Sequence, residues 1–470
     1  MKKMLMALSL SSALLGGSAV VWAEEAASTP VTEQTVAASD AVAASTVDVV
    51  AEVPAPAEAA PAPATEAKVD TGDTAWILVS TALVLLMTIP GLALFYGGMV
   101  RKKNVLSTMM FSLSAAILVS LIWVIAGYSL AFSGSGAYVG DFAKVMLNGV
   151  AYDALSGTIP ESLFVIFQMT FAIITVAIIS GSIADRMKYS AFMAFIAIWV
   201  ILVYAPITHW VWAADGWLFK AGALDFAGGT VVHINAGVAG LVAAYMLGKR
   251  AGLGRESMAP HNLTLTVIGA SLIWVGWFGF NGGSALGAGA RASMAILVTQ
   301  VAAAAAAFSW LIAERLVRGK ASVLGGASGA VAGLVVITPA AGYVGVGGAL
   351  IMGLVGGVVC FWGITALKRL LKADDALDAF GLHAVGGILG AVLTGIFYSD
   401  EIIKAANVTL APTLIEQLKV QVEGVLATIA YSAVMTFIIL KVIDLVIGIR
   451  VSADDERMGL DLSQHGERIE

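Results

Sequence analysis

The feature that most constrains this chain is a series of apolar runs, each about twenty residues long, separated by short polar loops. A run of this length crosses the hydrocarbon core of a bilayer as a single helix. Charged residues make up only 12% of the 470 residues, whereas soluble domains contain about a quarter. The sequence therefore predicts an all-α polytopic membrane protein.

Eleven transmembrane spans are predicted from the hydropathy pattern. They cover residues 75–99, 106–132, 161–183, 190–212, 226–248, 262–282, 292–316, 322–341, 344–367, 379–398 and 415–448. The last span is the longest, so we expect it to tilt or to project beyond the bilayer. The membrane domain is thus predicted at residues 74–448, followed by a tail at 449–470.

Two segments precede the membrane domain. Residues 1–23 have the pattern of a signal peptide: Lys2 and Lys3 come first, then an apolar core, then the A-x-A-like site Val21-Trp22-Ala23. An uncleaved membrane anchor is the alternative. Residues 24–73 are rich in Ala, Pro and acidic residues, which predicts an extended, disordered acidic tether outside the cytoplasm.

The distribution of basic residues predicts the orientation. Most lysines and arginines of the membrane domain lie in the loops that follow odd-numbered spans, and such loops face the cytoplasm. We therefore expect a multi-pass protein of the cell inner membrane. Its mature N-terminus would be periplasmic and its C-terminal tail cytoplasmic.

Two histidines occupy matching places in the predicted spans. His233 in span five and His383 in span ten each have glycines at +4 and +7, and each has an aspartate eight residues earlier (Asp225 and Asp375). Since these spans cross the membrane in opposite directions, the pattern predicts a 5+5 inverted repeat, with the long eleventh helix outside it.

The two histidines allow two interpretations. A single buried histidine is most often a hydrogen-bonded core residue. Polar side chains within a membrane are costly, however, and normally face a protein interior or a cavity. The matched pair favours a pore in which the two imidazoles meet near the midplane of the bilayer.

Four longer motifs carry a resemblance to a known family. They are "DFAGGTVVHINAGVAGLVAAYMLGKR", "IPGLALFYGGMVRKKNVLS", "WFGFNGGSA" and "FGLHAVGGILG". Together they closely resemble the ammonium transporter (Amt) family, over about residues 74–465. The resemblance implies a homotrimer of eleven-helix subunits, each with its own narrow pore.

Aromatic residues recur at helical spacing in two spans. Trp277, Phe280 and Ser284 share one face of a helix, and Phe164, Gln168, Phe171 and Thr175 form a second stripe. Such stripes are commonly core packing or interface belts. Sequence spacing alone does not choose among Trp210, Trp212 and Trp217.

The resemblance assigns roles to particular positions. It implies that ammonium is captured outside by Phe171, Trp212 and Ser284, with Asp225 contributing to the same site. Phe171 and Phe280 match a stacked gate. Beneath the gate, the twin histidines His233 and His383 line the pore, with Trp277 and Gln168 on the same path.

The role of Asp225 has two interpretations. It precedes a predicted helix and is followed by glycines at +3 and +4, which suits an N-cap carboxylate. Direct contact with the cation is the alternative. The cap is favoured, and the same interpretation applies to Asp378 near the start of span ten.

Selectivity is expected to come from deprotonation. Ammonium can lose a proton and pass as neutral NH3, whereas potassium has no such route across an apolar pore. The resemblance also implies that the tail motif "ERMGLD" docks on the inner face and helps to bind a trimeric PII-type regulatory protein; a solvated tail is the alternative. An ammonium sensor and an Rh-like gas channel are the rival functions. We expect no enzyme activity, no cofactor or metal, and no nucleic-acid partner, and we expect the single cysteine, Cys360, to be a buried apolar residue.

Overall fold

The computed structural model describes residues 68–469. The predicted signal peptide at 1–23 and residues 24–67 of the predicted tether lie outside the described residues. The first helix begins at Thr71, within the range assigned to the tether. It begins there because the Asp70 carboxylate accepts the backbone N–H of Asp73 at 2.9 Å, which is an N-cap.

The spans follow one another as predicted, and the loops and the tail add short helices and one small hairpin that were not predicted. The first five spans and their loops contain α2 (Thr71–Leu86), η1 (Met87–Leu92), α3 (Ala93–Met99), η2 (Lys102–Asn104), α4 (Val105–Ile122), η3 (Trp123–Gly127), α5 (Tyr128–Phe132), η4 (Val145–Leu147), β1 (Leu155–Ser156), β2 (Ile159–Pro160), α6 (Glu161–Ile183), α7 (Tyr189–Trp199), η5 (Val200–Tyr204), α8 (Ala205–Trp212), α9 (Trp217–Lys220), η6 (Gly229–Ile234) and α10 (Asn235–Leu247). Here η2 and η4 are 3-10 turns, and the other η segments are π-helical.

The remaining spans and the tail continue this pattern. They contain α11 (Leu263–Gly283), α12 (Ala290–Arg318), α13 (Val323–Ile337), α14 (Val346–Trp362), η7 (Gly363–Leu367), α15 (Lys368–Leu371), η8 (Phe380–Ala384), α16 (Val385–Phe397), α17 (Asp400–Ala405), α18 (Leu414–Ile447), α19 (Ala453–Met458) and α20 (Leu460–His465).

The predicted set of eleven apolar helices is confirmed within the described residues. Ten of these helices are long and apolar enough to cross a membrane, and the eighth, α13, is a shorter apolar helix. The last span, α18, has 34 residues and is the longest, as predicted.

The inverted repeat is visible in the backbone. The π-helical turns η6 and η8 each contain a histidine, and each leads into an α-helix of 13 residues, α10 or α16. The preceding spans of the two halves also contain matching π-helical turns, η5 and η7. The fourth and fifth spans of each half therefore share their π-helical turns as well as the sequence motif, whereas η1 and η3 of the first half have no counterpart in α11 and α12.

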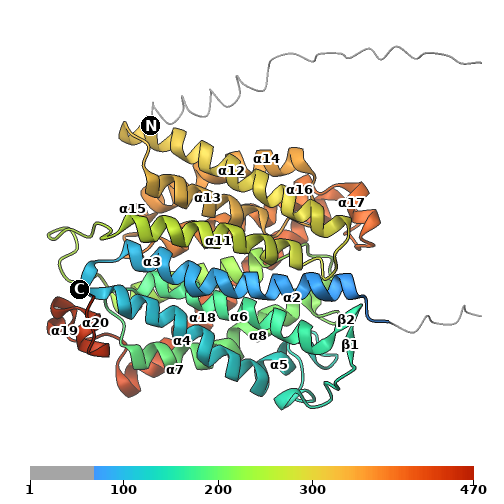
Figure 1. The fold of residues 1–470 in the computed structure, drawn as a ribbon, viewed down its shortest axis with the longest axis horizontal. Coiled ribbons are helices and arrows are strands. Elements are labelled where there is room, and N and C mark those ends of the chain that lie inside the picture. Colours follow the sequence, from blue (N-terminus) through green and yellow to red (C-terminus); the bar gives the residue numbers. More distant parts are fainter. Residues whose placement is uncertain (1–67, 470) are drawn as a thin grey trace, which may run out of the picture. The chain divides into compact units, whose positions relative to one another are not determined.

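Close helix packing brings the two repeats together. A Cβ added to Gly237 would lie 2.5 Å from the backbone nitrogen of Ala384, and one added to Gly387 would lie 2.7 Å from the Gly229 carbonyl oxygen. Glycine is therefore required where α10 meets η8 and where α16 meets η6. In Figure 1, α2 of the first half runs beside α11, the first helix of the second half, and the two helices are in contact.

The C-terminal tail is folded against the membrane domain. The backbone N–H of Leu460 donates to Asn104 Oδ1 at 2.8 Å, and Asp461 accepts the N–H of Ser107 at 2.7 Å. Glu456 is 2% exposed and pairs with Arg450. Figure 1 shows α19 and α20 near the ends of α3 and α4. The interpretation of the tail as a solvated end is therefore wrong.

Candidate functional site

The two histidines of the repeat meet inside the bundle. Their Nδ1 atoms are 3.2 Å apart, so one ring donates a hydrogen bond to the other, and the ring centroids are 5.3 Å apart at 20°. His233 is 1% exposed and His383 is 4% exposed. The Nε2 atom of His233 is buried and has no hydrogen-bond partner among the described residues. This nitrogen therefore remains available to a small polar molecule beside it.

Aromatic rings continue the stack away from the histidines. Trp277 stacks on His233 at 5.4 Å and 20°, and Phe280 lies 6.0 Å from the same imidazole. Phe171 packs against Phe280, with their centroids 4.3 Å apart. Phe171 and Phe280 are 1% and 0% exposed, so both rings are buried between Trp212 and His233.

Trp212 and Ser284 are half-buried and lie beside the two phenylalanines. The indole of Trp212 meets Phe171 edge-on at 5.7 Å and donates through Nε1 to the Asp225 carbonyl oxygen at 2.9 Å. Ser284 ends α11, and its hydroxyl donates to the Phe280 carbonyl oxygen at 2.8 Å. The structure therefore brings Phe171 and Trp212 into contact and joins Ser284 to this cluster through Phe280.

The other two tryptophans of this region point elsewhere. Trp210 donates to the Tyr138 carbonyl oxygen and packs on Trp217 and Tyr431. Among the three candidates that sequence spacing left open, only Trp212 has a recorded ring contact with Phe171. Trp212 is therefore the tryptophan positioned at the outer cluster.

Asp225 has the geometry of a helix cap. One carboxylate oxygen accepts the backbone N–H groups of Gly228 at 2.8 Å and Gly229 at 2.6 Å. The other accepts the N–H of Thr230 at 2.8 Å, and also the Thr230 hydroxyl. Gly228 has φ +114°, a left-handed conformation that glycine adopts without strain. Both oxygens are directed at the start of η6, and so they fix the turn that carries His233.

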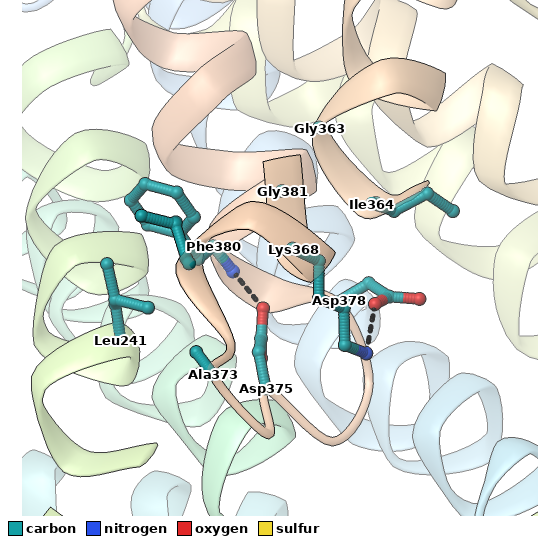
Figure 2. Close-up of a pocket in the computed structure, with 10 residues that line it drawn as sticks. Leu241, Gly363, Ile364, Lys368, Ala373, Asp375, Asp378, Phe380 and Gly381 are labelled. Atoms are coloured by element: carbon teal, nitrogen blue, oxygen red, sulfur yellow. Dashed lines mark hydrogen bonds and ion pairs between the residues drawn. The ribbon is translucent and has the colours of Figure 1, made fainter. Parts of the chain in front are cut away.

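The cap of the second repeat is Asp375, and the prediction of a cap at Asp378 is wrong. Asp375 accepts the N–H of Phe380 at 2.8 Å and the Ser182 hydroxyl at 2.7 Å. Asp378 has φ +63° and instead pairs with Lys368 at 2.6 Å. Figure 2 shows the Asp375–Phe380 and Lys368–Asp378 interactions beside a cavity of about 10 Å³, roughly the space of one water molecule.

The repeat itself contained the signal for the correct cap. Asp225 and Asp375 each precede their histidine by eight residues, whereas Asp378 has no counterpart at that spacing. Equivalent positions in the two halves make equivalent bonds here, so the spacing was a better guide than proximity to the helix start.

Gln168 lies one turn before Phe171 on α6, and its place on the path with the histidines stays a prediction. Its Oε1 atom is buried and unpaired within the described region. The sequence also missed Thr338, which accepts the Trp277 indole N–H at 2.8 Å and thereby fixes the ring beside His233. Thr338 follows the apolar run of α13, and spacing gave no signal for it.

Comparison with known proteins gives a consistent result. The Ammonium Transporter Family matches residues 75–469. An ammonium transporter of Bacillus subtilis is 49% identical over 84% of this chain and 98% of its own length. The ammonium transporter Amt1 of Archaeoglobus fulgidus is 46% identical over the same shares.

Solved structures agree with the sequence comparison. Mep2 of Saccharomyces cerevisiae superposes with a TM-score of 0.76 and 37% identity, over 82% of this chain and 88% of that protein. A structure described as a sensor Amt protein has a TM-score of 0.77 and 29% identity, over 84% of this chain and 98% of that protein.

Proposed function

The chain belongs to the ammonium transporter family, and we propose that it moves ammonium by capturing the cation outside and passing NH3 through the twin-histidine pore. The capture site is the cluster of Trp212, Phe171 and Ser284, with Asp225 shaping it. Aromatic faces attract a cation by about 0.5–2 kcal/mol each. A single positive charge arriving at this cluster would therefore be held before the closed phenylalanine pair.

The observation that carries this proposal is the stack of rings formed by Phe171, Phe280, His233 and His383, here called the ring column. Each imidazole bonds through Nδ1 to the other imidazole, and neither relies on a carboxylate at that nitrogen. Carrying an ion through such an apolar place costs from about 3 to over 10 kcal/mol. Ammonium avoids that cost by leaving its proton behind, and potassium cannot. The process is transport, because the loss of that proton is the only bond change and ammonia regains a proton from water on the other side.

The decisive experiment uses the purified full chain in liposomes. We expect an inward ammonium gradient to produce uptake, measured as a rise in pH inside the vesicles. An equal potassium gradient is expected to produce no flux above that of protein-free vesicles. Comparable potassium and ammonium fluxes through the wild-type protein would overturn the proposal.

We propose that the protein lies in the cell inner membrane with the N-terminus outside and the tail in the cytoplasm. The bias of basic residues toward loops after odd-numbered spans supports this orientation. It puts Trp212 on the outer side and the docked tail on the inner side.

We further propose that the protein is a homotrimer and that α11 and α12 contribute to its interface. Gln300 lies in the middle of α12 and is exposed, and its Oε1 accepts the indole N–H of Trp274 at 3.0 Å. Amide side chains in membrane helices normally bond across to another helix rather than face lipid. Its Oε1 has such a partner on α11, and a neighbouring copy would give the Gln300 Nε2 group the second polar partner that lipid does not provide.

The regulatory partner that we propose is a trimeric PII-type protein at the inner face. The support is the resemblance of "ERMGLD" to the family tail, together with the docking of that segment. Glu456, Leu460 and Asp461 are all buried against the loops after spans one and five. A protein bound at this face would therefore contact an ordered surface.

A further inference from the structure

The eleventh membrane helix, α18, stands outside the inverted repeat but has a buried polar face. Its buried polar residues are Gln417, Gln421, Thr428, Ser432 and Thr436, each at most 3% exposed. The opposite face is apolar and exposed, including Leu426 and Phe437. Buried polar groups in a membrane helix are costly unless they are hydrogen-bonded. The partners of this face therefore indicate what α18 holds in place.

Gln421 uses its whole amide group. Its Nε2 donates to the Leu224 carbonyl oxygen at 2.9 Å and to the Ala391 carbonyl oxygen at 2.8 Å. Its Oε1 accepts the Leu224 N–H at 2.6 Å and an N–H of Gln417 at 3.4 Å. One side chain thus bonds both backbone groups of Leu224 and also joins that residue to α16, the helix that follows His383.

A second glutamine holds the same segment. Gln417 Nε2 donates to the Gly222 carbonyl oxygen at 2.9 Å. Residues 222–224 lead directly into Asp225, whose carbonyl oxygen accepts the Trp212 indole N–H. The two glutamines therefore fix the backbone immediately before the residue that positions Trp212.

Gln421 also fits closely against its neighbours. A Cβ added to Gly395 on α16 would lie 3.0 Å from Gln421 Cγ. The side chain is consequently confined, and its amide has little freedom to find other partners. The Gln421 amide makes no hydrogen bond to His233 or His383 among the described residues.

We propose that Gln421 is a positioning residue for the outer capture site, acting through Leu224 and Asp225 on Trp212. The inference rests on the proposed function of that site. Because Gln421 touches neither the phenylalanine pair nor the histidines, its loss would weaken ammonium capture and leave passage through the pore nearly unchanged. It also gives α18 a role that the inverted repeat does not provide.

The test is transport kinetics in liposomes for Gln421→Met, which removes the amide and nearly keeps the side-chain length. We expect KM for ammonium to rise about tenfold, equivalent to about 1.4 kcal/mol, with the maximal rate within about twofold of wild type. The matched control is Thr436→Val, on the same buried face. It removes the acceptor of the Trp199 indole N–H at 2.9 Å, far from residues 222–224, and should leave KM unchanged.

Trp212→Phe separates this inference from the proposed function, because it removes the indole N–H bonded to Asp225. If both variants raise KM, and the double variant is no worse than the more affected single variant, they act through one segment. If Trp212→Phe raises KM and Gln421→Met does not, the positioning role is overturned and the capture site stands. If neither raises KM, the capture site itself is wrong.

A second variant covers the case in which Gln421→Met does not fold. Gln417→Met removes the bond to Gly222 and leaves the Gln421 bonds to Leu224 in place. We expect a smaller rise in KM for this variant. Because this variant keeps the Gln421 bonds to Leu224, a folded Gln417→Met protein with wild-type KM would show only that Gln417 is dispensable. The deciding variant is then Gln421→Leu, and a folded Gln421→Leu protein with wild-type KM would overturn the inference.

Discussion

Replacing His233 with aspartate should convert the pore into one that conducts potassium. The substitution puts a carboxylate at a buried place in the ring column. The imidazole that it replaces, His233, is 1% exposed and is hydrogen-bonded through Nδ1 to Nδ1 of His383. Loss of the Nδ1–Nδ1 bond and introduction of a charge would draw water into this segment. A metal cation would then meet a counter-charge at the place where it now meets imidazole.

The structure sets the size of the expected effect. The centroids of the two rings are 5.3 Å apart, so a potassium ion at the level of the His383 ring would lie about 5 Å from the new carboxylate. At an effective dielectric constant of about 20, that separation is worth roughly 3 kcal/mol. Lowering a barrier by this amount raises the rate roughly a hundredfold.

The assay compares potassium fluxes in liposomes containing wild-type or His233→Asp protein. His209→Asp serves as the control, since His209 is also fully buried but its ring nitrogens face the Ala131 and Gly136 carbonyl oxygens, away from the ring column. We expect potassium flux only from the His233→Asp protein. A folded His233→Asp protein that still excludes potassium would refute the selectivity role and leave His233 as a packing residue.

Four further outcomes are expected. Asp225→Asn should retain more thermal stability and transport than Asp225→Ala, because alanine loses a cap worth about 0.5–2 kcal/mol; equal, complete loss of transport by both folded variants would indicate a need for charge. Deleting residues 452–470 should lower transport and abolish pull-down of a PII-type protein, and undiminished pull-down would contradict this. Gln300→Leu should lower the fraction of trimer on native electrophoresis, and an unchanged trimer would remove α12 from the interface. Burial raises the pKa of Asp374, but the hydrogen bonds and the charge of Arg250 outweigh the effect of burial and hold this pKa below its ordinary value. A carboxyl group whose pKa is lower in the folded state than in the unfolded state stabilises the fold at pH values above the unfolded-state pKa. This stabilisation is lost as the pH falls through the folded-state pKa. The temperature at the midpoint of thermal unfolding should therefore decrease as the pH is lowered below about 4. This decrease should be less steep for the Asp374→Asn protein.

The spans and the histidine pair could be predicted from sequence because their signals are local. Apolar runs mark each helix, and His233 and His383 repeat one short motif at a fixed spacing from glycine and aspartate. Even the assignment of the cap residue in the second half was available from that spacing, and it was missed only because Asp378 is nearer to the helix start. Local pattern is sufficient where each residue's partners are close in sequence.

The rest depends on contacts between distant segments. Gln421 bonds Leu224 across 197 residues, and Trp277 finds its acceptor, Thr338, 61 residues away. The Leu460 N–H reaches Asn104 across 356 residues, which is why a tail with a solvated composition is docked. No periodicity in the sequence encodes such pairs, since they exist only after the helices have packed.

Because of the Nδ1–Nδ1 hydrogen bond, each proton that passes through the histidine pair leaves both rings in a different tautomer. Only one Nδ1 holds the shared proton, so in the uncharged pair the donor ring has a free Nε2 and the acceptor ring carries its proton on Nε2. A proton that enters at the free Nε2 and leaves from the other Nε2 moves the shared proton across and exchanges the two tautomers. A second proton travelling the same way then meets an N–H where the first met a lone pair. The pair must be reset before each further transfer, whereas a neutral molecule that slides past leaves both tautomers as they were.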